Sequence, residues 1–477
     1  MFVRYLTLAL IFITGNSFAA ERPNILLLSV DDLNDWVGVL DGHPQAKTPN
    51  IDRLAARGTL FYNAHCQAPV CNPSRASLMT SILPSSSGIY FLNPPIASSP
   101  LASKAMTMPQ RFQQEGYEVM AAGKLFHARE NKTYFPKYAG NFGGFGPVPK
   151  EKISHPRGHP LWDWGIYPDN TVDMPDDKTA KWTIQHLQKN YTKPFFIAAG
   201  FFRPHVPMYA PPEWFDMHPR NKIQLPLVKE NDREDLSEYA RNLTTLEHVA
   251  PLHEWVKASG EWPHAVQAYL ASTSLADACV GQVLDVLNAS PYKDNTIVVL
   301  FSDHGFHLGE KERWAKRSLW DDGTRVPMII VNPFAKDGEN RITKASVGLI
   351  DIYPTLLELC GLEADPIHEG HSLMPLLHDP NADWEHPAIT SFGPGNHAVR
   401  TERWRYIRYN DGSEELYDHA TDPHEWTNLA AQAKCAEIIK KHRAMLPIDK
   451  GSILGKGSTG HLAFSATEAI RAQGDTK

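Results

Sequence analysis

The segment Asn24-Ile-Leu-Leu-Leu-Ser-Val30, followed directly by Asp31-Asp32, decides the fold class. A continuous apolar run of this length is typical of a parallel strand that is buried on both faces of a sheet. The acidic pair then stands at the carboxyl end of that strand.

Two further runs have the same form. Residues 194–200 lead into Arg203-Pro-His205, and residues 295–302 end at Asp303-His304. Helical periodicity between residues 266 and 287 lies between strands, which favours an α/β fold with a mostly parallel central sheet flanked by helices. Ligands of such sheets bind at the carboxyl ends of the strands. The residues expected at that edge are Asp31, Asp32, His205, Asp303 and His304.

The pattern changes after Glu369 to a stretch rich in proline and aspartate, followed by short β-like segments at 398–400, 404–408 and 415–417. We predict a smaller C-terminal α+β domain over residues 380–477, after a larger N-terminal domain over residues 21–379 that contains the three strand ends. The segment from Asn141 to Trp164 has the composition of a long irregular loop, and such loops are often functional.

Residues 1–20 have the form of a signal peptide: Arg4, an apolar run from Tyr5 to Ile13, and Ser17-Phe-Ala19. The alternative, an uncleaved membrane anchor, is disfavoured because the run is far shorter than the roughly 20 residues that span a bilayer. The expected location is therefore periplasmic or secreted, without stable membrane insertion.

Composition excludes several function classes. The 477 residues carry a formal net charge of −7, which gives no electrostatic reason to bind nucleic acid. The five cysteines are an odd number and too few for a disulfide framework, so at least one is unpaired. The 22 histidines can serve as proton carriers or metal ligands, depending on position.

The two acidic strand ends suggest a cation site. Aspartates after a strand commonly cap the next helix, and for one pair alone that interpretation is as good as a metal site. Two such pairs in one chain favour a hard divalent cation bound by carboxylate oxygens.

The most specific motif is Cys71-Asn-Pro-Ser-Arg75. An isolated cysteine there would fit a buried thiol ahead of a helix that begins with proline. Further blocks accompany it in order: Gly123-Lys-Leu-Phe-His127, Arg203-Pro-His-Val-Pro207, Ser302-Asp-His-Gly305 and Trp314-Ala-Lys316. Together they resemble the sulfatase family of the alkaline phosphatase superfamily, in which the cysteine of Cys-x-Pro-Ser-Arg is oxidised to formylglycine.

The resemblance implies roles for these residues. The implied ligands of one divalent cation, expected to be Ca²⁺, are Asp31, Asp32, modified Cys71, Asp303 and His304. The hydrated aldehyde at position 71 is the implied nucleophile, and Arg75 holds its diol. The implied sulfate contacts are Lys124, His205 and Lys316, with His205 also the acid for the leaving alcohol. His127 is the implied base that regenerates the aldehyde, and a separate maturation enzyme must oxidise Cys71.

The blocks resemble the iduronate-2-sulfatase branch most, which implies a sulfated saccharide as substrate. Candidate substrate contacts are Arg203, which stands where that branch has lysine, and His307, Asn396 and His397. The loop from Asn141 to Trp164 is expected to line the pocket mouth. Two alternatives remain: a phosphonate or phosphate monoesterase of the same superfamily, and a saccharide-binding relative without catalysis.

Overall fold

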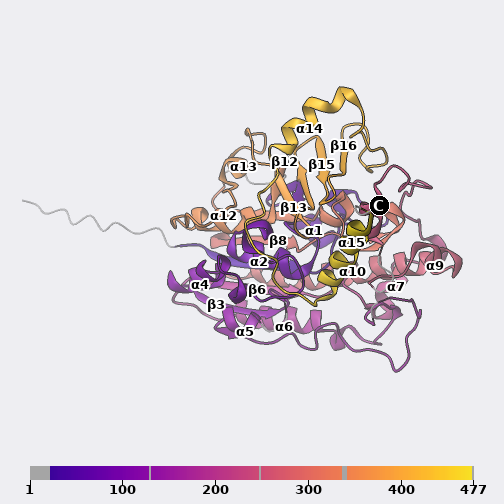
Figure 1. The fold of residues 1–477 in the computed structure, drawn as a ribbon. Coiled ribbons are helices and arrows are strands. Elements are labelled where there is room, and N and C mark those ends of the chain that lie inside the picture. Colours follow the sequence, from indigo (N-terminus) through magenta and orange to yellow (C-terminus); the bar gives the residue numbers. More distant parts are fainter. Residues whose placement is uncertain (1–21, 128–129, 159, 246–248, 336–340, 475–477) are drawn as a thin grey trace, which may run out of the picture.

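An eight-stranded mixed sheet forms the centre of the chain. The computed structural model describes residues 22–127, 130–158, 160–245, 249–335 and 341–474, so the predicted signal peptide lies outside the described residues (Figure 1). The strand order is β12-β2-β11-β8-β1-β6-β3-β4. The strands span Asn24–Val30 (β1), Thr59–His65 (β2), Glu118–Gly123 (β3), Lys137–Tyr138 (β4), Phe195–Phe201 (β6), Thr296–Ser302 (β8), Met328–Val331 (β11) and Arg341–Gly348 (β12).

The sheet is mostly parallel, as predicted. Strand β1 pairs in parallel with β6 on one side and with β8 on the other, and only β11 runs antiparallel to its neighbours. The three predicted apolar runs therefore lie side by side at the centre, and their carboxyl ends meet at one edge.

Alternate residues of β1 face two separate cores. Leu26 and Leu28 face a layer of helices that includes α10, whereas Ile25 and Leu27 face a layer that includes α2. Helices of the first layer are α1 (Pro49–Ala55), α6 (Pro175–Leu187), α7 (Pro212–Asp216) and α10 (Trp262–Ala289), and helices of the second are α2 (Cys71–Thr80), α4 (Met108–Gln114), α12 (Ile352–Leu359) and α13 (Met374–His378). This burial on both faces explains why β1 is apolar at successive positions.

Helix α10 covers the predicted helical stretch at 266–287. Within the described part of the chain it alone is long and apolar enough to cross a membrane, but 78% of that window is buried inside the protein. Its length and hydropathy thus belong to a core helix.

A four-stranded antiparallel sheet follows near the C-terminus, in the order β13-β14-β15-β16, and confirms the predicted C-terminal α+β region. Its strands are Ala388–Ser391 (β13), His397–Arg400 (β14), Trp404–Arg408 (β15) and Glu414–Asp418 (β16), with helix α14 (Ala436–Arg443) against it. Helix α15 (Thr459–Gly474) returns to the main body and packs on α8 (Glu238–Thr244).

The C-terminal sheet is tied to the segment that precedes Cys71. The Ser391 amide donates to the carbonyl of Gln67 at 2.9 Å, and the Thr390 hydroxyl donates to the carbonyl of Cys66 at 2.6 Å. The remaining elements are short: strands Trp164–Ile166 (β5), Met208–Ala210 (β7), His307–Leu308 (β9) and Trp314–Ala315 (β10), and helices Pro84–Ser87 (α3), Glu130–Tyr134 (α5), His253–Ala258 (α9) and Asp321–Thr324 (α11).

Two glycines bring β3 and β6 together at the functional edge. A Cβ on Gly123, whose φ is +76°, would lie 1.9 Å from the carbonyl oxygen of Gly200, and one on Gly200 would lie 2.2 Å from that of Lys124. Any side chain at either position would clash with backbone. The pair therefore lets the chain carry Lys124 across the end of β6 toward the ends of β1 and β8.

Candidate active site

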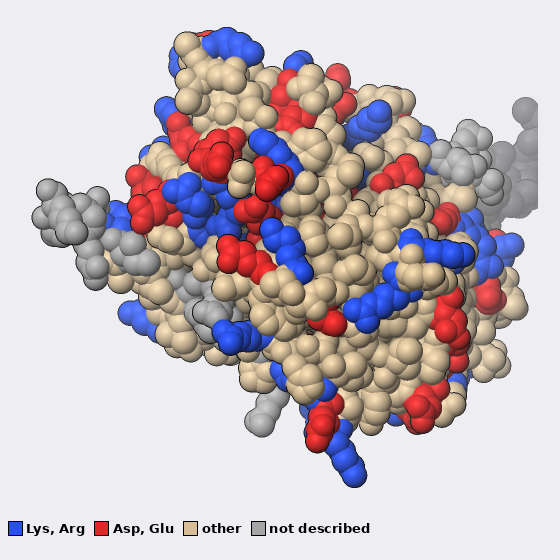
Figure 2. Space-filling view, turned by 90° about the vertical axis from the view of Figure 1, so that its right-hand side faces the viewer, with Lys and Arg blue, Asp and Glu red and all other residues tan. Residues whose placement is uncertain are grey.

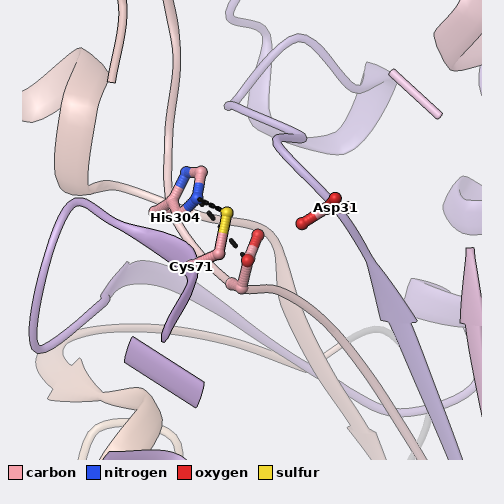
Figure 3. Close-up of side chains that lie close together, drawn as sticks. Asp31, Cys71 and His304 are labelled. Atoms are coloured by element: carbon pink, nitrogen blue, oxygen red, sulfur yellow. Dashed lines mark hydrogen bonds and ion pairs between the residues drawn. The ribbon is translucent and has the colours of Figure 1, made fainter. Parts of the chain in front are cut away.

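Cys71 is the first residue of α2 and lies at the centre of the predicted cluster. Its side chain is 2% exposed, and its Sγ is 3.2 Å from His304 Nε2 and 3.6 Å from Lys124 Nζ. Figure 3 shows the thiol between His304 and Asp31, which come from the ends of two strands. Burial raises the pKa of this thiol, so the side chain is a protonated, weakly nucleophilic thiol.

Three buried carboxylates surround that position, each with a cationic partner. Arg75 bridges Asp31 and Asp303 with two ion pairs of 2.9 Å. Lys124 Nζ is 2.5 Å from Asp31, and Lys316 Nζ is 2.7 Å from both oxygens of Asp32. The sequence motifs at residues 31, 75, 124, 303 and 316 thus converge in space.

The pKa values of Asp31 and Asp32 are shifted in opposite directions. Burial alone would raise the pKa of Asp31, but Lys124 and Arg75 outweigh it and hold the pKa well below its usual range. For Asp32 burial prevails over Lys316 and His304, and its pKa rises to about 7. Asp32 also has a left-handed backbone, with φ of 63°, and the Tyr269 hydroxyl of α10 donates to its carbonyl at 2.7 Å. Asp32 is therefore held in a strained position with its charge incompletely compensated.

The donor atoms at this edge fit a divalent cation. One ligand atom each from Asp31, Cys71, Asp303 and His304 lies within 4.8 Å of the others, and Asp32 Oδ1 is 3.4 Å from His304 Nε2. Several carboxylate oxygens facing one point are the ligands that hard cations prefer. The residues present thus fit a metal site, as the sequence predicted.

Two histidines flank the cluster in neutral form. Burial, with the charges of Lys124 and Arg75, lowers the pKa of His127 to about 4. Burial also lowers the pKa of His205 well below its usual value, and its Nδ1 contacts the Val206 carbonyl at 2.5 Å. Since that contact engages Nδ1, Nε2 is the atom that faces the cluster, 3.8 Å from Asp32 Oδ2.

A cavity of about 210 Å³ opens onto Cys71. Four predicted catalytic side chains line it together with Cys71, namely Lys124, His127, His205 and Lys316. The predicted loop also contributes, through Phe145, Leu161 and Trp162. The Phe145 ring lies 4.7 Å from the His205 ring and 5.6 Å from Lys124 Nζ. Cations, imidazoles and aromatic rings thus line the cavity together.

Arg203 is placed differently from the expectation of a substrate contact. It is fully buried, and its guanidinium donates to the carbonyls of Tyr209 (2.8 Å), His205 (3.3 Å) and Phe145 (2.7 Å). The sequence could not show that these donors point into the loop. Arg203 therefore fixes the backbone that carries His205 and Phe145.

The other three candidate substrate contacts are also buried and engaged elsewhere. His307 contacts the Ser318 hydroxyl at 2.6 Å, and His397 contacts Asp449 at 3.1 Å. Asn396 accepts the Asn410 amide at 2.9 Å. None of the three is among the described residues that line the cavity at Cys71. His307 Nε2, His397 and Asn396 thus have partners within the fold, whereas His307 Nδ1 is buried without a hydrogen-bond partner among the described residues.

Residues that the sequence did not single out also belong to this site. Arg317 lines the cavity, next to Lys316, and Tyr269 supports Asp32 from α10. A buried tyrosine on an apolar helix face carries no sequence signal for function. Arg317 directly follows Lys316, a predicted catalytic residue, and this position next to it is the one sequence feature that could have pointed to Arg317.

A second buried group of acids and bases, the inter-sheet cluster, consists of Asp321, Arg405, His419 and Glu425. Arg405 forms ion pairs of 2.6 Å with Asp321 and 2.5 Å with Glu425, and His419 is 2.9 Å from Glu425. One ligand atom each from Asp321, His419 and Glu425 lies within 4.8 Å of the others, so this group also has the spacing of a metal site.

Comparison with known protein families and structures agrees with this geometry. The family model described as Sulfatase matches residues 23–362, and that of the N-sulphoglucosamine sulphohydrolase C-terminal region matches residues 309–449. Fold and site define a hydrolase of sulfuric esters. The chain belongs to the sulfatase family.

Individual relatives span most of the chain. It is 40% identical to a sulfatase of Formosa agariphila, over 90% of this chain and 87% of that protein. It is 28% identical to a Delta 4,5-hexuronate-2-O-sulfatase of Bacteroides thetaiotaomicron (90% and 89%) and 31% identical to the iduronate 2-sulfatase of Mus musculus (74% and 71%). The predicted resemblance to the iduronate-2-sulfatase branch is thereby confirmed.

The fold is shared beyond sulfatases. The phosphonate monoester hydrolase of Agrobacterium radiobacter superposes with a TM-score of 0.71 at 21% identity, over 89% of this chain and 94% of that one. At that identity the likeness concerns the fold alone.

Proposed function

We propose that this chain is an exported, calcium-dependent sulfatase that hydrolyses sulfate esters of a saccharide with formylglycine at position 71 as nucleophile. The observation that carries the proposal is the setting of Cys71, which combines a central position among carboxylates and cations with a raised thiol pKa. A thiol that acts directly as nucleophile requires a lowered pKa. An aldehyde hydrate at the same position supplies a hydroxyl instead.

Asp31, Asp32, Asp303, His304 and an oxygen of the modified residue would hold the cation. The oxygen-rich set favours Ca²⁺ over Zn²⁺, whose sites usually contain several nitrogen or sulfur ligands. When bound, the cation supplies positive charge that offsets the carboxylates and the sulfate oxygens.

The first chemical step transfers the sulfuryl group to residue 71. One hydroxyl of the hydrate, held near Arg75, passes its proton to one of the carboxylates around residue 71 and attacks the sulfur, so an O–S bond forms and the S–O bond to the sugar breaks. Lys124 and Lys316 hold the sulfate oxygens on which charge develops. His205 is neutral without substrate, and the negative charge of a bound sulfate ester raises its pKa. It thereby gains the proton that the leaving alcohol takes up.

The second step releases sulfate. His127, whose pKa of about 4 keeps it neutral, removes the proton from the remaining hydroxyl of residue 71. The C=O bond re-forms as the bond from carbon to the sulfate oxygen breaks, and water then rehydrates the aldehyde. A sulfate ester on a serine has no second hydroxyl and thus no such route.

The substrate class we propose is a sulfated saccharide, with a 2-O-sulfated uronate as the specific candidate. Two relatives are named for 2-O-sulfates of uronates, and aromatic side chains are among those that line the cavity, which suits a sugar ring. Export through the predicted signal peptide, and oxidation of Cys71 by a maturation enzyme, belong to the same proposal.

The test compares nitrophenyl sulfate, nitrophenyl phosphate and a phenyl phosphonate ester as substrates of native enzyme whose residue 71 has been analysed by peptide mass spectrometry. We expect formylglycine, preference for the sulfate, and loss of turnover by Cys71→Ala with unchanged thermal unfolding. Full activity with an unmodified thiol contradicts the proposal. Preference for the phosphonate supports the monoesterase alternative, and no turnover despite modification supports a binding protein.

A further inference from the structure

A second cavity, of about 410 Å³, adjoins the catalytic one. Val249 and Arg317 line both cavities, so the two spaces meet at these residues. Arg313 and Trp314 are buried in the wall of the second cavity, and Lys257 of α9 is exposed at its rim. A saccharide bound through its sulfate at Cys71 has room to extend past Arg317.

Arg317 is a buried cation whose side-chain donors are not all satisfied by the described residues. Only 7% of it is exposed, and its Nε and Nη1 have no hydrogen-bond partner in the described chain. Burial lowers its pKa to about 10, which still leaves it charged at neutral pH. A buried charge of this kind is costly unless a ligand compensates it. Arg203, which is fully buried, differs in that its guanidinium donates to backbone carbonyls.

The backbone holds Arg317 in this position. Its φ of 72° is left-handed, and its amide donates to the Pro69 carbonyl at 3.0 Å, two residues before Cys71. The guanidinium of Arg313 donates to the carbonyls of Lys316 and Arg317. The backbone of the segment is thus fixed from two sides, and it cannot move Arg317 away from the cavity without breaking these bonds.

Acidic residues of the second cavity lie toward the outside. Glu230 and Glu254 are exposed and Glu312 is half-buried, whereas Arg313 and Arg317 are buried. Basic and acidic side chains are also interspersed on the molecular face in Figure 2. The positive charge at Arg317 is therefore local to the junction of the two cavities.

We propose that Arg317 binds a second anionic group of the substrate, a carboxylate or a further sulfate carried by the saccharide whose ester is cleaved at residue 71. The planar guanidinium suits such groups because it donates two parallel hydrogen bonds to their oxygens. This inference rests on the proposed sulfatase function and adds a specificity residue to it.

The experiment measures kcat and KM for three substrates: nitrophenyl sulfate, a 2-O-sulfated uronate disaccharide and a glucosamine carrying two sulfates. The variants are Arg317→Met, Arg317→Lys and, as a control that removes a rim charge, Lys257→Met. For Arg317→Met we expect kcat/KM to fall about 10- to 100-fold more on an anionic saccharide than on nitrophenyl sulfate, mainly through KM. Arg317→Lys should recover part of the loss, and Lys257→Met should change all three substrates less than about 3-fold.

The Tm of Arg317→Met distinguishes substrate binding from a purely structural role, because loss of a structural residue would lower the Tm. Because Nε and Nη1 of Arg317 are buried without hydrogen-bond partners in the described part of the chain, Arg317→Met should leave the Tm unchanged or raise it. A lowered Tm together with equal losses on all three substrates overturns the inference.

The pattern of losses identifies the anion. A loss confined to the uronate assigns the carboxylate, and one confined to the disulfated sugar assigns the second sulfate. If native enzyme cleaves nitrophenyl sulfate but Arg317→Met affects all three substrates equally, the inference fails and the sulfatase function stands. If modified native enzyme cleaves no sulfate ester, the proposed function fails as well.

Discussion

The catalytic cluster around Cys71 and the inter-sheet cluster around Arg405 contain similar residue types, and each has the ligand spacing of a metal site. They differ in how the acids are compensated. Burial alone would raise the pKa of Asp321, but His419, Arg405 and Arg400 hold it well below its usual range, whereas the pKa of Asp32 rises to about 7. The catalytic cluster also faces a cavity, while Asp321, His419 and Glu425 line neither cavity described above. Proximity of ligands alone therefore does not identify a metal site. We favour the cluster at Cys71 as the metal site because the charge of Asp32 is incompletely compensated there and the cluster lies beside a cavity.

The largest effect should come from removing a carboxylate of the catalytic cluster. We expect Ca²⁺ to raise the Tm of the native protein, and we expect Asp31→Asn to abolish that rise and to lower kcat at least about 1,000-fold, because the ion loses a charged ligand. Glu425→Gln is the matched change in the other cluster and should keep the Ca²⁺-dependent rise. Differential scanning fluorimetry with and without chelator measures both, and the reverse result would exchange the two assignments.

A smaller effect, on stability, should come from Arg405→Met. This change removes the two ion pairs of Arg405 and leaves Arg400 and His419 as the remaining basic partners of Asp321 and Glu425, and we expect it to cost about 3–5 kcal/mol of unfolding free energy. Urea denaturation measures the loss, with kcat of the remaining folded protein as control. A variant as stable as the native protein would mean that this network contributes little to the joint between the sheets.

A smaller loss of stability should come from Arg203→Met, which removes a single buried arginine outside both clusters. Three backbone carbonyls lose a donor, so we expect a loss of about 2 kcal/mol. The accompanying loss of kcat/KM should be equal for nitrophenyl sulfate and a uronate sulfate, since Arg203 fixes the loop rather than the sugar. A selective rise of KM for the uronate would restore Arg203 as a substrate contact.

The smallest expected effect is the change in kcat of the native enzyme when the pH is lowered from 7 to 6. Burial lowers the pKa of His127 to about 4, so its neutral, proton-accepting form persists as the pH falls through 6.5. In calcium-saturated enzyme we therefore expect kcat to change less than about 2-fold between pH 7 and pH 6. An acid limb centred near pH 6.5 would show an unperturbed histidine at this step.

The ends of the central strands could be predicted because the residues that specify them are neighbours in the sequence. An apolar run followed by Asp31-Asp32 or Asp303-His304 specifies both a buried parallel strand and the edge where its acids emerge. The structure brings Cys71, Arg75, Lys124, His127, His205 and Lys316 to that same edge.

Side-chain direction in the loops could not be predicted in this way. Arg203 and Arg317 are both arginines in loops near the site, yet one donates to three carbonyls while the other has unpartnered donors. That difference depends on Tyr209 and Phe145 around the first and on Pro69 and Arg313 around the second. No local pattern encodes such contacts between distant segments.

The burial of Cys71 bears on when, during folding of the chain, its thiol can be oxidised. In the folded chain its side chain is 2% exposed, and β13, more than 300 residues later in the sequence, is bonded to the segment just before it. Of the two cavities described above, the thiol borders only that of about 210 Å³, whereas before β13 docks the segment around it is not yet enclosed. If Cys71 is oxidised as proposed, we therefore expect conditions that slow the docking of the C-terminal sheet to raise the fraction of modified protein.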